Sequence, residues 1–397
     1  MFFFNIFIKF YSLILIILLS LLYPLFKIKI GCIRTKTIGN GSISLEIFYY
    51  ETLNNIHPKS INLWFHDKKI SNQFILDRFK KKFIIVPGIF LFHVHEYINR
   101  FKLNFLKVPM RKWTNLEGLF NLKKIEQICP CKDIYNVLTK NKPFIEFNTR
   151  EHDKAKKILY NLNLNIDDKI VCLSTRTPTF KNEKFTSVRN GKIENLITAA
   201  RYIVSRGYKA VFVGDKYKEL ENEKNDNFIL YSNSKYKSDF LDFYTIYLAK
   251  FLIQCPSGIG QIAVMMRKPR LIVNYFSLEQ VYTETYHEPT LIIPKKIKKI
   301  NEDIFISYSE FLRERISIIK TCEALKERGF AAYENTDEEI LSATKEMIDT
   351  IENKNYLVDN SDQKFWIEYN KIFNGLGPKK PRISDVFYNS NKSLFEA

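Results

Sequence analysis

The sequence predicts an α/β protein in which two Rossmann-like domains follow an apolar N-terminal helix. Three observations support this fold class: an apolar N-terminal segment, a strand–helix–strand alternation up to about residue 88, and a second alternation from about residue 168. Strands that alternate with helices are typical of parallel sheets covered by helices. The predicted division is a membrane anchor over 1–30, an N-terminal domain over 31–165, a C-terminal domain over 166–365, and a tail over 366–397.

The N-terminal segment is long enough to span a membrane. No charged residue occurs from Phe10 to Phe26, and a spanning helix needs about 17–25 apolar residues. A cleaved signal peptide would have a basic start and a small-x-small site, and neither end fits. Cations follow the segment whereas only Lys9 enters it, so we expect one uncleaved anchor with the body on the cytoplasmic side of the inner membrane. Because Pro24 interrupts its end, a hydrophobic hairpin or an in-plane helix is an open alternative.

The chain is strongly basic, with 61 Lys and Arg against 43 Asp and Glu and a net charge of +18. This charge fits phosphate-bearing partners, although a Lys- and Asn-rich composition bias contributes to it. The basic runs Arg78–Lys82 and Lys295–Lys299 have no interleaved aromatic platform or known motif, so no nucleic-acid partner is predicted. Both runs are candidates for a membrane-facing surface, with ordinary solvated faces as the alternative.

The six cysteines do not resemble a disulfide framework in a chain of this length. Cys129 and Cys131 form the only close pair, and no further Cys or His lies nearby at ligand spacing. Free thiols are therefore expected, and no metal site is predicted.

The first domain is predicted to open with a short strand and a Gly-rich turn at Gly39–Gly41. Strands are expected at 60–67 and 83–88, on either side of a helix over 70–82 that Asn72 caps. The stretch from about Ile98 to Phe147 is aromatic, basic and irregular.

A helix from Arg150 closes the predicted N-terminal domain and leads into a strand over 168–176, which opens the second domain. A helix follows over 191–207, where apolar residues recur every three or four positions until Gly207 ends it. Further segments are expected in the order strand 208–215, strand 228–233, helix 238–250, a strand before Cys255, a helix after Gly258 and strand 270–276; helices then dominate to about residue 353.

The turn Pro256–Gly260 stands between a strand and a helix start. Backbone N–H groups and the helix dipole favour a diphosphate at such a place, and glycines allow the backbone to approach it closely. A plain structural turn is the alternative. A nicotinamide-dependent oxidoreductase is not predicted, because Gly39-Asn40-Gly41 lacks the third glycine of the dinucleotide fingerprint.

Two arginines and one acid are candidates for contacts with such a ligand. Arg176 ends a strand and Arg189 precedes the helix of 191–207, and a guanidinium can hold a phosphate through two parallel hydrogen bonds. Asp215 ends the next strand and could contact a ribose or sugar hydroxyl. The alternatives are surface ion pairs for the arginines and an ordinary loop acid for Asp215.

Several segments together resemble the glycosyltransferases of bacterial surface-polysaccharide clusters, over most of the chain after the anchor. "TIGNGSISLEIFYY" is similar to the family's opening, with Gly39 and Glu46 matching and Asn40 in place of a usual His. "SVRNGKIENLITAARYIVSRGYKAVFVGD" is similar to a second family segment, and "SGIGQIAVMMRKPRLIVN" to a third. In "VCLSTRTPTF", Arg176 matches the family pattern. Ser174 and Thr177 replace its His and acid.

The resemblance implies a GT-B-like fold, in which two Rossmann-like domains face a cleft and the second holds a nucleotide sugar. It implies transfer of a sugar from that donor to a lipid-linked, membrane-associated or polysaccharide acceptor, without a cofactor or bound metal. The implied donor-binding residues are Arg176, Arg189, Asn190, Asp215, Ser257, Gly258 and Gly260, and the implied acceptor-side loop contains Gly39 and Asn40.

No catalytic base is assigned by the sequence. A base must lie near the acceptor hydroxyl, and the candidates are Glu46, His93 and His95, the last two expected on one face of a strand. A catalytically inactive membrane-associated scaffold of the same fold is the alternative function, because Ser174 and Thr177 depart from the family pattern.

Overall fold

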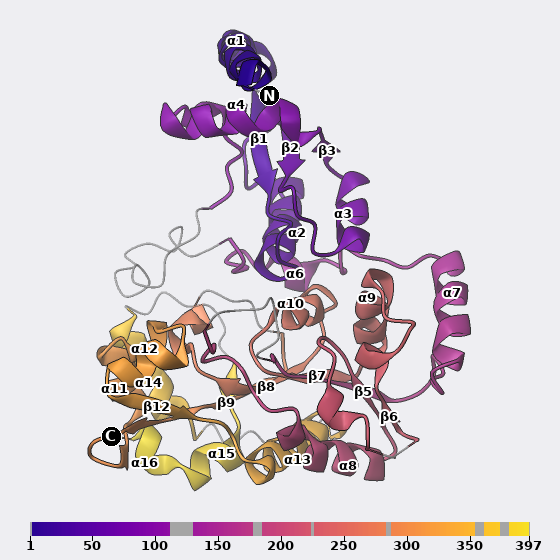
Figure 1. Cartoon of the computed structure of the whole chain (residues 1–397), viewed down its shortest axis with the longest axis vertical. Coiled ribbons are helices and arrows are strands. Elements are labelled where there is room, and N and C mark those ends of the chain that lie inside the picture. The colour runs from indigo at the N-terminus through magenta and orange to yellow at the C-terminus, as the bar shows by residue number, and fades with distance from the viewer. Residues whose placement is uncertain are drawn as a thin grey trace. The chain divides into compact units, whose positions relative to one another are not determined.

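The computed structural model describes residues 2–111, 130–177, 185–223, 226–282, 287–353, 361–373 and 381–396 (Figure 1). It divides into two compact units. Unit 1 comprises Met1–Arg111 and Tyr135–Ile145, and unit 2 comprises Lys112–Ile134 and Glu146–Ala397. Two α/β units with parallel sheets agree with the predicted fold class.

Unit 1 contains a three-stranded parallel sheet in the order β1-β2-β3. Its strands are β1 (Ile28–Ile33), β2 (Ile61–His66) and β3 (Ile84–Ile85). Its helices are α1 (Phe2–Phe26), α2 (Gly39–Leu53), α3 (Gln73–Lys80), α4 (Gly88–Arg100), the 3-10 turn η1 (Asn104–Leu106) and α6 (Val137–Lys140). As predicted, the Asn72 side chain caps α3 by accepting a hydrogen bond from the Ile75 N–H at 3.0 Å.

Two local predictions in unit 1 are wrong. The Gly39–Gly41 segment is the first turn of α2 and not a loop. The segment that contains His93 and His95 belongs to the helix α4, so these two residues do not share a strand face. Leu91, Val94 and Ile98 of α4 are buried, and their spacing of three and four residues is that of a helix. The helix α1 continues through Pro24 to Phe26.

Unit 2 is built on a seven-stranded sheet in the order β13-β9-β8-β7-β4-β5-β6, with every pair parallel. Its strands are β4 (Ile170–Ser174), β5 (Lys209–Phe212), β6 (Phe228–Ile229), β7 (Phe251–Gln254), β8 (Arg270–Tyr275), β9 (Thr290–Pro294) and β13 (Arg382–Ile383). A small antiparallel sheet pairs β10 (Lys296–Lys299) with β11 (Ile304–Phe305) and β12 (Phe330–Tyr333).

Helices accompany these strands along the chain. They are α7 (Thr149–Tyr160), α8 (Ile197–Ser205), α9 (Asp239–Leu248), α10 (Gly258–Met265), α11 (Tyr308–Arg313), α12 (Cys322–Glu327), α13 (Asp337–Glu352), α14 (Gln363–Ile372), α15 (Asp385–Ser390) and α16 (Lys392–Phe395). Short 3-10 turns are η4 (Glu194–Leu196), η5 (Lys218–Leu220), η6 (Tyr231–Asn233), η7 (Leu278–Tyr282) and η8 (Ile316–Ile318).

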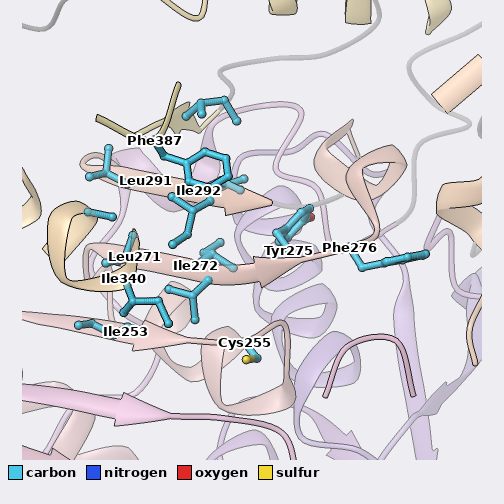
Figure 2. Packing of buried hydrophobic residues seen from close by; sticks show 14 of the residues in the cluster. Ile253, Cys255, Leu271, Ile272, Tyr275, Phe276, Leu291, Ile292, Ile340 and Phe387 are labelled. Atoms are coloured by element: carbon cyan, nitrogen blue, oxygen red, sulfur yellow. The ribbon is translucent and has the colours of Figure 1, made fainter. Parts of the chain in front are cut away.

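The core of unit 2 explains why its strands read as continuous apolar runs. All residues of β4, β7, β8 and β9 are buried, as expected for a parallel sheet covered on both faces. Figure 2 shows side chains of β8 and β9 packed together, with Ile340 of α13 and Phe387 of α15 among them.

One helix and the predicted C-terminal tail belong to a different unit from the domain in which the sequence placed them. The helix α7 falls within the predicted N-terminal domain, yet it belongs to unit 2, where the His152 ring is hydrogen-bonded to the Tyr244 hydroxyl of α9 at 2.8 Å. The described part of the predicted tail is also part of unit 2. Glu346 of α13 accepts hydrogen bonds from Ser384 Oγ at 2.6 Å and from the Asp385 N–H at 3.2 Å, and β13 extends the main sheet.

The helix α9 contains a buried acid with a testable pH dependence. Burial raises the pKa of Asp242 from 3.8 to about 6, and the Tyr231 hydroxyl donates a hydrogen bond to its Oδ1 at 2.9 Å. Because the folded-state pKa is the higher one, this group's contribution to stability is present below pH 3.8 and is lost as the pH rises through about 6.

We therefore expect Asp242→Asn, which is neutral at every pH, to be more stable than the wild type at pH 8 by about 1–3 kcal/mol. The gain should shrink toward zero near pH 4. Denaturant unfolding of both proteins at several pH values measures it, and a difference that does not vary with pH would contradict the prediction.

Candidate functional site

The strand order of unit 2 reverses at β4. This strand comes first in the chain and lies inside the sheet, with β5 and β6 on one side and β7, β8 and β9 on the other. In open α/β sheets, ligands bind beyond the carboxyl ends of the strands at such a reversal. The segment after β4 and the segment after β7 meet there, because the Cys255 N–H donates a hydrogen bond to the Ser174 carbonyl at 3.2 Å.

Two buried cations converge on Asn190 at this edge. Arg176 Nη1 donates a hydrogen bond to the Asn190 side-chain oxygen at 2.9 Å, and Lys295 Nζ donates one to the Asn190 carbonyl at 2.7 Å. Arg176 and Lys295 are each 4% exposed. The Gly191 N–H closes the arrangement by donating to the Arg176 carbonyl at 3.1 Å. A pair of buried cations beside a strand end provides charge that favours an anionic ligand.

The predicted site residues Arg176 and Asn190 are thus brought together, whereas Lys295 was missed as a site residue. The sequence placed Lys295 in a surface run, and it follows β9, about 100 residues after Asn190. Only the order of strands in the sheet brings the two together, so no local signal could have found this pair. Arg189 is half-buried, and its N–H donates to Ser187 Oγ at 3.4 Å.

A second missed feature is the asparagine pair behind these cations. The Asn274 N–H donates to Asn335 Oδ1 at 2.6 Å, and the Asn335 N–H donates to Asn274 Oδ1 at 2.7 Å. Asn274 lies on β8 with a φ of +54°, a backbone conformation that asparagine tolerates better than most residues. Asn274 is a polar residue inside the apolar run of β8, and this pattern alone could have indicated a position with a hydrogen-bonding role.

The backbone at Gly191 lies against this pair. A Cβ on Gly191 would lie 2.6 Å from Cys255 Sγ and 2.9 Å from Asn274 Nδ2. Burial raises the pKa of the Cys255 thiol to about 11, although Lys295 acts in the opposite direction. Cys255 is therefore a neutral packing group at physiological pH and not a nucleophile.

Each of the two residues that depart from the family pattern has hydrogen-bond partners within unit 2. Thr177 donates to Asp215 Oδ2 through its N–H at 3.2 Å and its Oγ1 at 2.9 Å. Ser174 Oγ lies 3.3 Å from the hydroxyl of Tyr217, which accepts a hydrogen bond from the Thr175 N–H at 3.0 Å. Ser174 also lies under Gly214, where a Cβ would approach Ser174 Oγ to 2.7 Å. Both substituted side chains therefore have structural partners here, and Asp215 orients the segment after β4.

The segment after β7 leads directly into the helix α10, as the sequence predicted. Ser257 is the N-cap residue, and its side chain makes no capping hydrogen bond. Its Oγ instead lies 3.4 Å from Gln254 Oε1. Gly258 is the first helical residue, so the N–H groups of this turn are donors that the Ser257 side chain does not satisfy.

Gly260 has a different reason to be glycine from the one predicted. A Cβ at this position would come within 2.0 Å of Gln254 Nε2, so the buried Gln254 side chain occupies the space. The glycine permits packing of the strand end against the first turn of the helix.

In unit 1, the candidate bases have structural partners. Glu46 is fully buried in α2, and its Oε1 accepts a hydrogen bond from the Phe144 N–H at 3.0 Å. His93 Nδ1 lies 2.8 Å from Glu96 Oε2. Burial lowers the pKa of His95 to about 4, which leaves its ring neutral at physiological pH.

The predicted acceptor-side loop is the start of a helix. Gly39 and Asn40 lie in the first turn of α2, after the carboxyl end of β1. Gly41 follows them, and a Cβ there would lie 2.1 Å from the carbonyl oxygen of Arg34. The close approach of α2 to the end of β1 explains why this turn is rich in glycine.

The basic run Lys295–Lys299 does not form a free basic surface. Lys295 is buried, and the other three lysines form ion pairs. Lys296 lies 2.8 Å from Glu339, Lys298 lies 2.6 Å from Asp303, and Lys299 lies 3.1 Å from Glu310. These ion pairs offset most of the charge of the run, and its membrane-facing role stays a prediction. In the run Arg78–Lys82, Lys80 pairs with Asp77 at 3.2 Å, whereas Lys81 and Lys82 are exposed.

Cys131, Cys172 and Cys255 are buried free thiols, and Cys32 and Cys322 are partly exposed. Cys129 lies outside the described residues. Within the described ranges, no group of three or more His, Cys, Asp or Glu residues is placed to hold a metal ion.

Comparisons with known proteins give similarity only at the level of structure. No family model matches the chain, and no curated protein matches it in sequence. The chain is similar to heptosyltransferase II of E. coli, with 15% identity over 67% of this chain and 90% of that one and a TM-score of 0.43. It is similar to a family 9 glycosyl transferase from Veillonella parvula, with 13% identity over 81% of this chain and 97% of that one and a TM-score of 0.46.

The chain is also similar to the UDP-GlcNAc 2-epimerase of Methanocaldococcus jannaschii, with 11% identity over 67% of this chain and 89% of that one and a TM-score of 0.36. Two of these three proteins are glycosyltransferases, the class named by the sequence resemblance. All three TM-scores lie below 0.5, so the likeness alone establishes neither activity nor substrate.

Proposed function

We propose that this protein is a glycosyltransferase that takes a sugar from a nucleotide-sugar donor, whose diphosphate binds at the carboxyl ends of β4 and β7. The observation that carries the proposal is the strand-order reversal at β4, where the buried cations Arg176 and Lys295 lie beside the segment that opens α10. Backbone donors at a helix start and fixed cations are the two kinds of group that proteins use to hold a diphosphate.

In this proposal, the same groups would assist the reaction as well as binding. Negative charge grows on the leaving nucleoside diphosphate as the bond to the sugar breaks. Donors and cations that are already fixed in place stabilise this charge without reorganising. Arg176 and Lys295 supply the positive charge, so the proposed transfer requires no resident cofactor or metal, and we expect it to persist in EDTA.

We propose a membrane-associated, lipid-linked or polysaccharide acceptor. Support comes from the apolar helix of unit 1, since the segment Phe7–Phe26 is long and apolar enough to cross a membrane, although a signal sequence would pass the same test. The cations that follow this helix support a body on the cytoplasmic side, because the cytoplasmic leaflet carries the anionic lipids that attract such cations. No catalytic base is assigned.

A binding screen tests the proposed activity. Full-length protein in detergent is titrated calorimetrically with a panel of nucleotide sugars and nucleoside diphosphates, and at least one member of each class is expected to bind. Absence of binding to every member would sink the proposal and favour the alternative of a catalytically inactive scaffold.

The segment that opens α10 gives a sharper test. Ser257→Leu places a bulky side chain at the proposed diphosphate position and removes no capping hydrogen bond, so we expect the donor KM to rise about tenfold or more at little cost in stability. Gly258→Leu is expected to act in the same way.

The matched control is Ser238→Leu at the N-cap of α9, where the serine side chain does cap the helix by accepting a hydrogen bond from the Leu241 N–H at 3.3 Å. It should lower stability by about 1 kcal/mol and leave the donor KM unchanged. Unchanged donor affinity in both variants of the α10 start would remove this segment from the site.

A further inference from the structure

The N-terminal helix α1 is part of the folded body of unit 1. Ser12, Ile16 and Leu19 of α1 are buried, with exposures of 0%, 6% and 6%. Ile16 and Leu19 belong to an apolar cluster that α4, β1 and η1 complete with Leu91, Val94, Ile98, Ile30 and Leu106. Figure 1 shows α1 beside α4 at one end of unit 1. Removal of α1 would therefore uncover this cluster, which argues against a cleaved signal peptide.

The packed part of α1 covers much of its length. Toward the end of the helix, the Tyr23 ring lies 5.0 Å from the Phe105 ring in an edge-to-face contact. From Ser12 to Tyr23, about 17 Å of helix therefore lies against unit 1. Only Lys27 separates the end of α1 at Phe26 from the start of β1 at Ile28. Its N–H donates to the Tyr23 carbonyl at 2.9 Å, so no flexible linker lets the helix leave the body.

The opposite face of α1 is apolar as well and is uncovered. Phe7, Ile17, Leu21 and Leu25 are 66%, 60%, 69% and 76% exposed. Phe10, Ile14 and Leu18 are also exposed, and all seven side chains follow helical spacing along one stripe. We call these seven residues the outer stripe. A contiguous apolar surface of this kind marks a place where another apolar body binds.

A spanning orientation does not fit this arrangement. The hydrocarbon core of a bilayer is about 30 Å thick, so a spanning α1 would need nearly its whole length within lipid. The helix α4 packs against the middle of α1 and would enter the hydrocarbon with it. Glu96, Asn99 and Arg100 of α4 are exposed, and polar groups facing hydrocarbon are strongly unfavourable.

We propose that α1 lies in the plane of one leaflet of an anionic bilayer, with the outer stripe in the acyl boundary and the opposite stripe on unit 1. Charge complementarity identifies the partner. Exposed cations lie near both ends of α1: Lys9 is in its third turn, Lys27 follows its last residue, and Lys102 lies three residues before Phe105, whose ring contacts Tyr23. Cations at this depth bind anionic headgroups, and an in-plane apolar helix enters the leaflet by about 5–10 Å. The protein is thus a monotopic membrane protein, and this inference does not depend on the transferase activity.

Membrane topology distinguishes the two orientations directly. The full chain carries one epitope tag at each end and is inserted into sealed vesicles that are then treated with protease. An in-plane helix leaves both tags on the same side, so both are cleaved together or protected together. One tag cleaved and the other protected would overturn the proposal, because only a spanning helix separates the two ends.

Substitution of the outer stripe tests its contact with lipid. Ile17→Glu combined with Leu21→Glu is expected to keep the thermal stability of the full chain and to weaken binding to phosphatidylglycerol vesicles by about tenfold or more. The control Tyr160→Glu changes a side chain that is 74% exposed in α7 and should bind as the wild type does. Wild-type binding by the double variant would overturn the proposal. So would a wild-type chain that ignores anionic vesicles and instead forms a dimer that the double substitution dissociates, since a second copy would then cover the stripe.

Discussion

Replacing Arg176 with alanine is expected to lower kcat/KM for sugar transfer by roughly a hundredfold or more, the usual effect of removing one fixed donor that faces developing charge. The side chain is 4% exposed and is held by Asn190 at 2.9 Å, so its position is set before any ligand arrives. Arg176→Lys retains the charge and loses the planar fork, and an intermediate rate is expected.

A structural role for Arg176 would give a different pattern. Asn190→Ala removes the same hydrogen bond and keeps the guanidinium. Each of Asn190→Ala and Arg176→Ala should therefore lower the free energy of unfolding by about 1–3 kcal/mol, and the two losses should be similar. Its effect on kcat/KM should be much smaller. Steady-state kinetics and thermal unfolding of the three variants separate the roles, and equal kinetic losses in Asn190→Ala and Arg176→Ala would contradict a ligand contact.

Gly41→Ala is expected to destabilise unit 1 by about 3 kcal/mol, at the upper end of the usual cost of overpacking. The added Cβ would lie 2.1 Å from the Arg34 carbonyl oxygen, and a backbone atom cannot rotate away as a side chain can. The first turn of α2 would therefore have to move from the end of β1.

Gly88→Ala is the matched control in the same unit. There the Cβ would lie 3.5 Å from its nearest neighbour, an ordinary contact at the first residue of α4, so a change within about 1 kcal/mol is expected. Denaturant unfolding measures both, with the buried Trp64 as a fluorescent reporter in unit 1. Equal stabilities of the two variants would show that α2 is free to shift.

The sequence predicts most of unit 2, because its signals are local and agree with one another. The strands β4, β7 and β8 are uninterrupted apolar runs, and Gly207 follows α8 with a φ of +80°, as a glycine that ends a helix does. In unit 1 the signals compete. In α4 the alternation of His93 and His95 suggests a strand, whereas the buried residues Leu91, Val94 and Ile98 follow helical spacing, and packing against α1 decides for the helix.

The candidate site is predictable only where its residues lie at strand ends. Arg176, Asp215 and Ser257 follow β4, β5 and β7 directly, so the pattern of elements places them at one edge of the sheet. Lys295 and Asn335 reach that edge through contacts with Asn190 and Asn274, residues far away in the chain. Such contacts depend on strand order, which neither composition nor periodicity specifies.

The location of the donor site is tested most directly by hydrogen–deuterium exchange of the full chain with and without a nucleoside diphosphate that calorimetry shows to bind. Protection is expected in peptides that contain Arg176, Asn190–Gly191 and the start of α10 from Ser257. A bound diphosphate would contact Arg176 and the donors at the start of α10, and it would stabilise the hydrogen bonds that join Asn190 and Gly191 to Arg176. Protection confined to unit 1, with no change at the ends of β4 and β7, would contradict the account.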